Sequence, residues 1–328
     1  MVQLRRPSMA LIVVCLAAAT ISAQELKLPQ TRNAALRYWM AFALMQDPPA
    51  DKDTQALLEK VAEGTALWDE ARLGAILDKN TEAILIMQRA TRLPECDWGL
   101  EYELGPETPV AHLAKARVLA RLNVLYGMRL AARHDSAGAV DAWLAGLRFA
   151  RHLTQGASLI GALTAKAALV ADLNALSRAV ANGSLDEASI TRVNAAVRAL
   201  PEYGFDWRQA VLFEVAATEP VFRELRESRD ARKTYRRWLG GEPPTSFSVP
   251  SVAEVTQWKA LMVQAASALQ LPNPAAVARM AEIEGELAKL NPLIRLTVPS
   301  LARINEARGQ VSAARENVLR AIDRHRDH

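Results

Sequence analysis

The chain has 328 residues and a formal net charge of +4; half of its residues are apolar and 23% are charged. These proportions exclude an intrinsically disordered chain and a collagen-like one. Two cysteines are too few for a disulfide scaffold or a four-cysteine zinc site. Glycine and proline, with 15 and 16 residues, are scarce beside abundant alanine and leucine, so the composition predicts an all-α protein.

The first 23 residues have the pattern of a secretory signal peptide. Arg5 and Arg6 precede the apolar run Met9–Ile21, and Ser22 and Ala23 supply small residues at a cleavage site. The run is shorter than the about 20 residues of a transmembrane helix, although a retained N-terminal anchor is the alternative. Cleavage would remove two positive charges and no acid, which lowers the net charge from +4 to +2. We therefore expect a periplasmic or secreted protein.

Apolar residues recur at helical spacing along most of the mature chain. In residues 33–45, Leu36, Trp39, Met40 and Ala43 fall on one face of a helix. No stretch alternates apolar and polar residues over the length of a strand. The predicted helices cover residues 33–45, 53–63, 65–90, 109–133, 136–153, 158–181, 184–200, 205–218, 220–239, 252–269, 274–290 and 299–328.

Three local signals bear on the boundaries of these helices. Asn80 and Thr81 could divide the third helix, because short polar side chains compete for backbone hydrogen bonds. Ser184 and Glu187 have the spacing of a capping box at a helix start. Pro220 is expected to separate two helices, since proline lacks the backbone N–H that a helix interior needs.

We expect these helices to pack as antiparallel hairpins in an irregular, tetratricopeptide-like stack. Residues 24–240 would form the helical-hairpin body, residues 241–250 a linker, and residues 251–328 a smaller C-terminal helical bundle. A shift by one repeat length does not reproduce the repeat pattern, so a regular array is not predicted. One hairpin matches the small, small, large and small positions of a tetratricopeptide repeat, with Gly127, Ala139, Trp143 and Gly146.

Standard catalytic and metal-binding motifs are missing from the sequence. HExxH, CxxC, GxSxG, SxxK and a glycine-rich phosphate loop do not occur. His112, His134 and His152 are too widely spaced to predict a zinc site. Cys96 stands among acids that would raise the pKa of its thiol, so we expect a buried, inert cysteine. No metal or other cofactor is predicted.

The best candidate site is the acidic part of the non-helical stretch Leu93–Pro109, within residues 96–107. Long loops inside compact chains are often functional. Carboxylates beside exposed aromatic rings suit a cation, a sugar or a basic segment of a partner. The alternative is that Trp98 fills the core while the acids face solvent. The candidate binding residues are Asp97, Trp98, Glu101, Tyr102 and Glu103.

The segment Arg223–Arg237 is strongly basic, with seven basic and three acidic residues. A solvated helix face is the simplest interpretation. Its basic end, Arg232–Arg237, could also contact anionic lipid or an acidic partner. No basic tail with interleaved aromatic residues occurs, so nucleic acid is not expected as a partner.

Four stretches of the mature chain carry a family resemblance. They are LPECDWGLEYELGPETPVAHLAKARVLARLNVL, AGLRFARHLTQGASLIGAL, NAALRYWMAFALM and VPSLARINEARGQVSAARENVL. They resemble a family of signal-peptide-bearing, all-helical exported proteins from environmental bacteria. The resemblance implies a bacterial exported protein with a tetratricopeptide-like helical body. No enzyme activity is attached to that family, so no catalytic residue is implied.

The features together favour an exported, non-catalytic helical scaffold that binds a protein or peptide partner. A helical-scaffold hydrolase for cell-wall or sugar polymers, with carboxylates of the 96–107 loop as its acid and base, is a second hypothesis. A membrane-apposed protein with an uncleaved leader is a third. The sequence does not indicate the oligomeric state.

Overall fold

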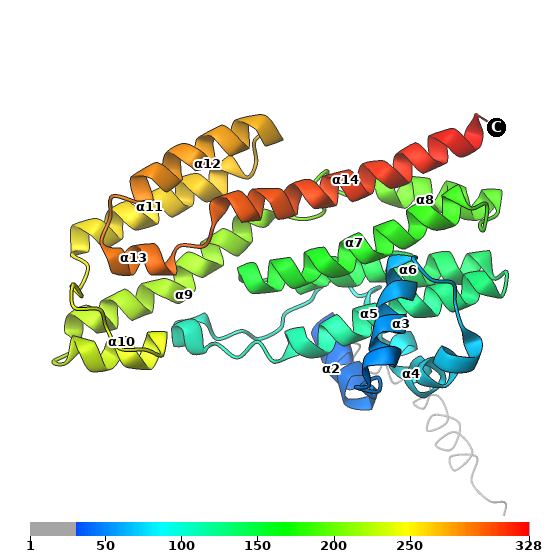
Figure 1. Cartoon of the computed structure of the whole chain (residues 1–328), viewed down its shortest axis with the longest axis horizontal. Helices are drawn as coiled ribbons and strands as arrows, with labels where there is room; N and C mark the ends of the chain where they lie inside the picture. Colours follow the sequence, from blue (N-terminus) through cyan, green and yellow to red (C-terminus); the bar gives the residue numbers. More distant parts are fainter. Residues whose placement is uncertain (1–30, 328) are drawn as a thin grey trace, which may run out of the picture. The chain divides into compact units, whose positions relative to one another are not determined.

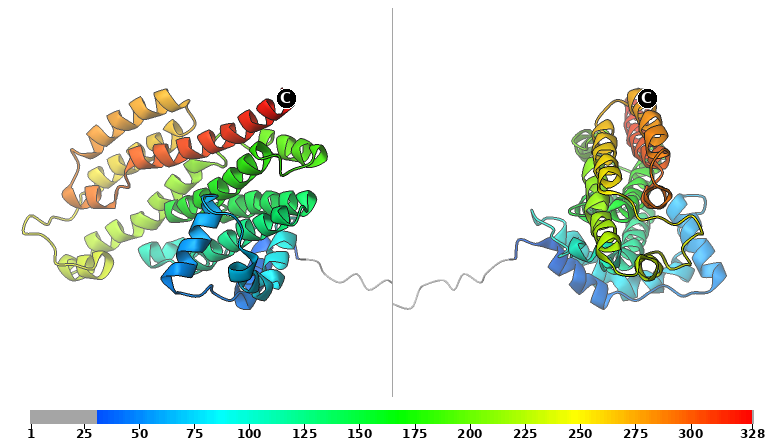
Figure 2. Two further views of the ribbon diagram at one scale, coloured as in Figure 1. Left: turned by 45° about the vertical axis from the view of Figure 1, so that its right-hand side comes forward. Right: turned by 90° about the vertical axis from the view of Figure 1, so that its left-hand side faces the viewer.

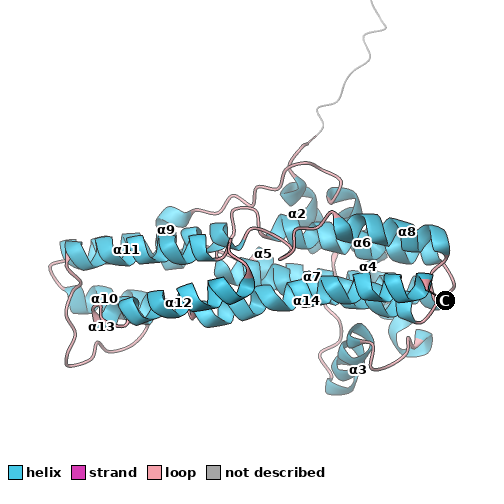
Figure 3. Ribbon diagram, turned by 90° about the horizontal axis from the view of Figure 1, so that it is seen from above, coloured by secondary structure: helices cyan, strands magenta, loops and turns pink. Residues whose placement is uncertain are grey.

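The computed structural model describes residues 31–327, so the predicted leader, residues 1–23, lies outside the described residues. Residues 33–327 form one compact unit. Between residues 31 and 327 the chain forms thirteen α-helices, one 3-10 helix and an isolated bridge between Asn33 and Glu95, but no strand (Figure 3). The prediction of an all-α protein is therefore confirmed.

Long helices packed side by side form the centre of this unit (Figure 1). Helices α5 and α6 form an antiparallel hairpin, α7 packs on α6, and the last helix, α14, packs along α7. Helices α2 and α4 pack together against this group, while α3 contacts α5 and α7. The bounds are α2 Ala34–Leu44, α3 Lys52–Glu63, α4 Glu70–Ala90, η1 Tyr102–Glu107, α5 His112–Ala132, α6 Ser136–Leu153, α7 Leu159–Ala181 and α14 Leu301–Arg326.

A second group of helices gathers around α9 at the other end of the unit (Figure 2). Helices α10 and α11 pack on α9, and α12 packs on α11. Helix α14 contacts α12 as well as α7 and α8, so the C-terminal region is joined to the body by its own last helix. The bounds are α8 Glu187–Arg198, α9 Trp207–Glu227, α10 Ala231–Leu239, α11 Val252–Ala268, α12 Asn273–Leu287 and α13 Pro292–Thr297, the last of which was not predicted.

Helix α4 is continuous through Asn80 and Thr81, at the position where a break was considered. Asn80 is buried, and its side chain accepts a hydrogen bond from the backbone N–H of Gln46 (2.8 Å) and donates one to the carbonyl of Ile76 (2.9 Å). Thr81 donates to the carbonyl of Leu77 (2.8 Å). Both polar side chains therefore find partners without interrupting the helix.

The predicted capping box of Ser184 and Glu187 is wrong by two residues. Helix α8 begins at Glu187, and its N-cap is Asp186. The Asp186 carboxylate accepts the backbone N–H of Ser189 at 2.8 Å, as an N-cap side chain does. Ser184 instead lies in the turn that follows Gly183, and its carbonyl accepts a hydrogen bond from Ser136 (3.1 Å).

The predicted break at Pro220 is also wrong, because α9 runs through it. Proline removes one helical hydrogen bond, but the next turn is held by tertiary packing, with Phe222 buried edge-on against Trp258 (centroids 5.1 Å apart). The helix ends seven residues later, at Glu227, and Ser228 is its C-cap. Asp230 then caps α10 by accepting the backbone N–H of Lys233 (3.0 Å).

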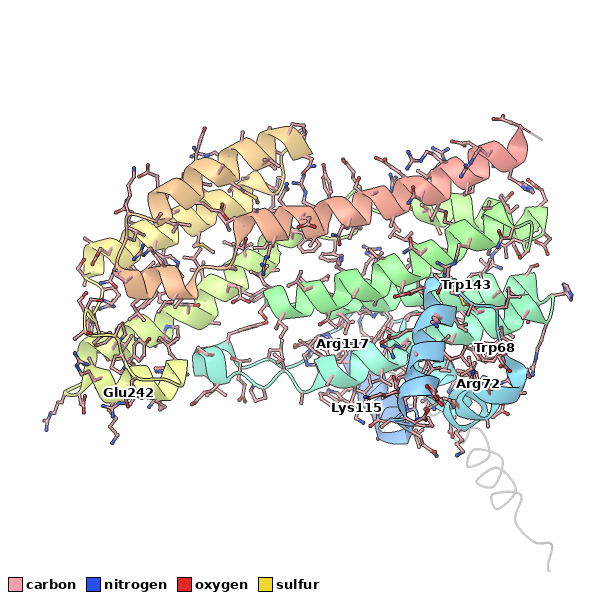
Figure 4. The ribbon with its side chains drawn as sticks, in the orientation of Figure 1. Trp68, Arg72, Lys115, Arg117, Trp143 and Glu242 are labelled. Carbon is pink, nitrogen blue, oxygen red and sulfur yellow. The ribbon has the colours of Figure 1, made fainter. Side chains whose placement is uncertain are left out.

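Two glycines allow close packing on the two faces of α6, one at its contact with α5 and one at its contact with α7. A Cβ added to Gly127 would lie 2.4 Å from Nε1 of Trp143, a buried indole of α6 that donates to the carbonyl of Val124 (3.2 Å; Figure 4). The prediction that small residues let these helices approach is therefore correct at Gly127. On the other face of α6, a Cβ on Gly146 would lie 2.1 Å from Oδ2 of Asp172 in α7.

Asp172 is a carboxyl group enclosed in the core. Its exposed fraction is 0%, and neither side-chain oxygen has a hydrogen-bond partner in the part of the chain that the structure describes. Burial raises the pKa of this carboxyl well above its usual value, because the apolar surroundings disfavour the charged form. Burial therefore favours the protonated, uncharged form of Asp172, and Gly146 provides the space that this side chain occupies.

The apolar stripe predicted for residues 33–45 is not the buried face of α2. The opposite face from the predicted apolar stripe packs inward, with Tyr38 and Phe42 in the core. The stripe itself faces outward, and Leu36 and Met40 are 57% and 58% exposed. Both faces of this helix are apolar, so periodicity alone could not distinguish them.

Candidate functional site

The 96–107 loop is fastened to the start of α2. The side chain of Asn33, which caps α2, accepts the backbone N–H of Asp97 (2.9 Å) and donates to the carbonyl of the same residue (2.9 Å). The backbone N–H of Ala34 donates to the carbonyl of Glu95 (2.7 Å). Gly99 then turns the chain with a positive φ of 65°, a conformation that glycine adopts at little cost. The candidate residues are thus held on an ordered backbone.

Trp98 lies in the interior, with 7% of its surface exposed. Its ring stacks on His112 (centroids 4.4 Å apart) and on Tyr38 (5.6 Å). Its indole N–H donates to the carbonyl of His152 (3.0 Å), so the polar atom of the ring is satisfied. Asp97, Glu101 and Glu103 are exposed. Trp98 therefore anchors the loop from beneath and does not present its ring to solvent.

The groups beside Trp98 remain uncharged at neutral pH because they are buried. Burial lowers the pKa of His112 to about 4 and, together with the charges of Arg151 and Arg148, that of His152 to about 4. Burial and the charge of Asp97 raise the pKa of the Cys96 thiol to about 12. A thiol that stays protonated is a poor nucleophile. The two histidines form a structural aromatic cluster with Trp98 and Tyr38, and Cys96 is a buried, unreactive thiol.

Tyr102 joins the loop to two helices. Its hydroxyl donates to the carbonyl of Gly156, in the turn between α6 and α7, and its ring stacks on Phe213 of α9 (centroids 4.8 Å apart). Burial raises the pKa of the Tyr102 hydroxyl to about 12, so it remains a donor. Three residues on, Gly105 approaches α9 so closely that an added Cβ would lie 2.9 Å from the carbonyl oxygen of Ala217. The 3-10 helix η1 therefore packs closely against α9.

The packing of η1 against α9 creates a groove between two segments singled out in the sequence, the 96–107 loop and Arg223–Arg237. The acidic loop forms one wall, and the basic segment of α9 and α10 forms the other. The cavity has a volume of about 410 Å³. We call it the acidic groove; its lining residues are Glu103, Leu104, Glu107, Pro220, Arg223, Glu224, Glu227, Arg237 and Trp238.

The acidic groove has a surplus of negative charge. Four carboxylates and two guanidinium groups line it. Glu224 is engaged, because it accepts hydrogen bonds from Arg237 and from the indole N–H of Trp238 (3.0 Å). The Arg237 guanidinium also lies over the Trp238 ring, 4.6 Å from its centroid. No ion pair to another described residue engages Glu103, Glu107 or Glu227, so these three carboxylates are available to a ligand.

Sequence reasoning singled out Glu103 and the basic segment Arg223–Arg237, but it did not predict that they line one groove. Leu104, Glu107 and Trp238 were not among the candidate residues, and Asp97 and Glu101 are not among the lining side chains. The signal available in the sequence was the presence of an acidic loop and a basic segment, whose opposite charges could attract each other. The sequence alone did not indicate that the two meet.

The basic end Arg232–Arg237 is partly engaged by its own surroundings. Arg236 lies 3.8 Å from Glu242, which follows α10 (Figure 4), while Arg232 lies over the ring of Phe247 (5.8 Å to the centroid). Within residues 31–327, no three side chains of histidine, cysteine, aspartate or glutamate are grouped so as to hold a metal ion. One helix of the same range, α7, is long and apolar enough to span a membrane, and most of it is buried in the core.

The fold and the groove define an all-α protein with an acidic, tryptophan-lined surface cavity. Comparisons with models of known protein families, with curated proteins and with solved structures find no significant match. The family resemblance of the four sequence stretches therefore stays a prediction.

Proposed function

We propose that this protein is an exported, non-catalytic helical scaffold that binds a basic segment of a protein or peptide partner in the acidic groove. The observation that carries the proposal is the set of three unpaired carboxylates, Glu103, Glu107 and Glu227, around one cavity. Complementary charge promotes association and selects among partners.

The rest of the groove suits the long stems of lysine and arginine. Leu104 is 40% exposed, and Pro220 adds a second apolar side chain. Trp238 offers a ring whose N–H is fixed by Glu224, so its orientation is set before a ligand arrives. Lysine and arginine bury their methylene stems on such surfaces while their charged ends meet carboxylates. Fixing the ring in advance reduces the entropy lost on binding.

The same arrangement favours binding over the alternative of a hydrolase. A glycosidase needs two carboxyl groups facing each other across a substrate, one of them with a raised pKa. Asp97, Glu101 and Glu103 are exposed, and Trp98 is too deeply buried to stack on a sugar. The carboxyl with a strongly raised pKa, Asp172, lies closed in the core.

The test uses a fluorescein-labelled nonapeptide of alternating lysine and leucine, titrated with the mature protein while anisotropy is recorded. We expect saturable binding that weakens as salt is raised, because exposed charges are screened. The double variant Glu103→Gln/Glu107→Gln should weaken binding at least tenfold, since it removes two of the three unpaired carboxylates.

The matched control is Glu316→Gln, an exposed glutamate of α14 outside the groove. It should bind the peptide within twofold of the parent protein. The proposal is wrong if the double variant and the parent bind equally, or if a glutamate–leucine peptide binds as well as the lysine–leucine peptide.

Export is the second part of the proposal and rests on the leader pattern of residues 1–23. We expect the protein recovered from outside the cytoplasm of an expressing bacterium to have the mass of residues 24–328. Intact-mass spectrometry measures this directly. The full-length mass in that fraction would instead support a retained anchor, and recovery only from the cytoplasm would contradict export.

A further inference from the structure

A second hollow lies away from the acidic groove, where α6 faces the end of α8 and the start of α9. It consists of two adjoining cavities that share Arg148 and Arg151 of α6. The larger one, of about 510 Å³, adds the polar side chains of Thr91, Thr154 and Gln155. The smaller one, of about 180 Å³, is mainly apolar and is lined by Leu144, Leu147 and Leu200. We call the whole hollow the arginine pocket.

The two arginines of this pocket have no carboxylate partner. Neither Arg148 nor Arg151 makes an ion pair with another residue between 31 and 327, and Arg148 has one long hydrogen bond, to the hydroxyl of Thr91 (3.4 Å). Neighbouring arginines behave differently. Arg192, for example, pairs with Asp141, and Arg129 pairs with both Glu70 and Asp78. The two guanidinium groups of the pocket thus lack a direct ion-pair partner among the described residues, although the charge of Asp141 acts on Arg148 from a distance.

The pKa shifts of Arg148 and His152 indicate a positive electrostatic potential in the pocket. Partial burial and the charge of Arg92 lower the pKa of Arg148. The charges of both pocket arginines add to burial in lowering the pKa of His152, which also lines the pocket. One carboxylate lies among the lining side chains, that of Asp206, and it accepts the backbone N–H of Arg208 (2.9 Å) as the N-cap of α9.

We propose that the arginine pocket binds a small organic carboxylate that carries a short apolar chain. Arg148 and Arg151 are three residues apart on α6, so their side chains emerge from the same face and can converge on one anion. The planar guanidinium group matches the geometry of a carboxylate. The apolar chain would lie along Leu144, Leu147 and Leu200 in the smaller cavity. A site that combines both features discriminates against simple inorganic anions.

Calorimetric titration of the mature protein with sodium octanoate tests this inference. We expect one site per chain, with acetate at least fivefold weaker because it lacks the apolar chain. Octyltrimethylammonium, which has the same chain length but the opposite charge, should not bind at this site. The double variant Arg148→Gln/Arg151→Gln should weaken octanoate binding at least tenfold while keeping the helical circular dichroism of the parent.

The matched control is Arg303→Gln, an exposed arginine of α14 that does not line the pocket. It should bind octanoate within twofold of the parent. Equal binding by the double variant, or equal binding of octanoate and octyltrimethylammonium, would overturn the proposal. Acetate or inorganic phosphate binding as tightly as octanoate would overturn the assignment of the apolar chain to the smaller cavity.

Discussion

Replacing Trp98 by alanine is expected to lower the free energy of unfolding by about 4 kcal/mol, the usual cost of removing a buried tryptophan. The substitution removes the stacking of the indole on His112 and Tyr38 and its hydrogen bond to the carbonyl of His152. It also detaches the loop that carries Glu103 from the core. Urea denaturation followed by circular dichroism measures the change.

Trp39→Ala is the matched control, because Trp39 belongs to the same aromatic cluster but is 42% exposed. We expect it to cost about 2.5 kcal/mol, in proportion to the smaller area that it buries. A Trp98 variant as stable as the Trp39 variant would contradict the buried position of Trp98. Because Trp98→Ala destabilises the whole loop, binding experiments on the acidic groove should vary its carboxylates instead.

The second large effect concerns Asp172, whose replacement by asparagine is expected to make stability less dependent on pH. In the folded protein the pKa of this carboxyl is raised well above 3.8 by burial. At a pH between 3.8 and the raised pKa of the folded state, the folded protein therefore holds a proton on Asp172 that the unfolded chain has lost. The stability contributed by Asp172 is fully present below pH 3.8 and falls by about 1.4 kcal/mol per pH unit as the pH rises toward the folded pKa.

Urea denaturation of the parent and of Asp172→Asn at pH 5, 6, 7 and 8 gives the free energy of unfolding of each protein. The difference between the two, plotted against pH, measures this slope. We expect the variant to gain stability relative to the parent as the pH rises from 5, until the pH reaches the raised pKa of Asp172 in the folded protein. Asp141→Asn, which removes an exposed carboxylate paired with Arg192, should show no such trend in this range. A constant difference between the parent and Asp172→Asn would mean that the carboxyl is already ionised in the fold.

Much of the helical fold follows from local sequence, since periodicity and capping residues act within a few positions. The segments 136–153 and 158–181 are nearly the observed α6 and α7, and Gly183 has the positive φ expected after a helix end. Prolines were harder to interpret, because Pro220 is tolerated inside α9 where tertiary packing of Phe222 holds the helix.

The candidate sites were less predictable because they depend on distant contacts. The loop at Glu103 meets Trp238 only after α9 and α10 have packed, and no local pattern encodes that meeting. The burial of Trp98 likewise depends on Tyr38 and His112, which lie on two other helices. Asp172 reads in sequence as an ordinary helix acid, and only the packing of Gly146 against it places it in the core.

The pairing of α7 with α14 has a consequence for how the chain is made. From Ala181 to Leu301, about 120 residues must be synthesised after α7 is complete before the helix that covers it begins. During that interval α7, the one helix among residues 31–327 that is long and apolar enough to span a membrane, lacks its final neighbour. The face of α7 that α14 covers therefore stays open in the nascent chain until the last helix has been released.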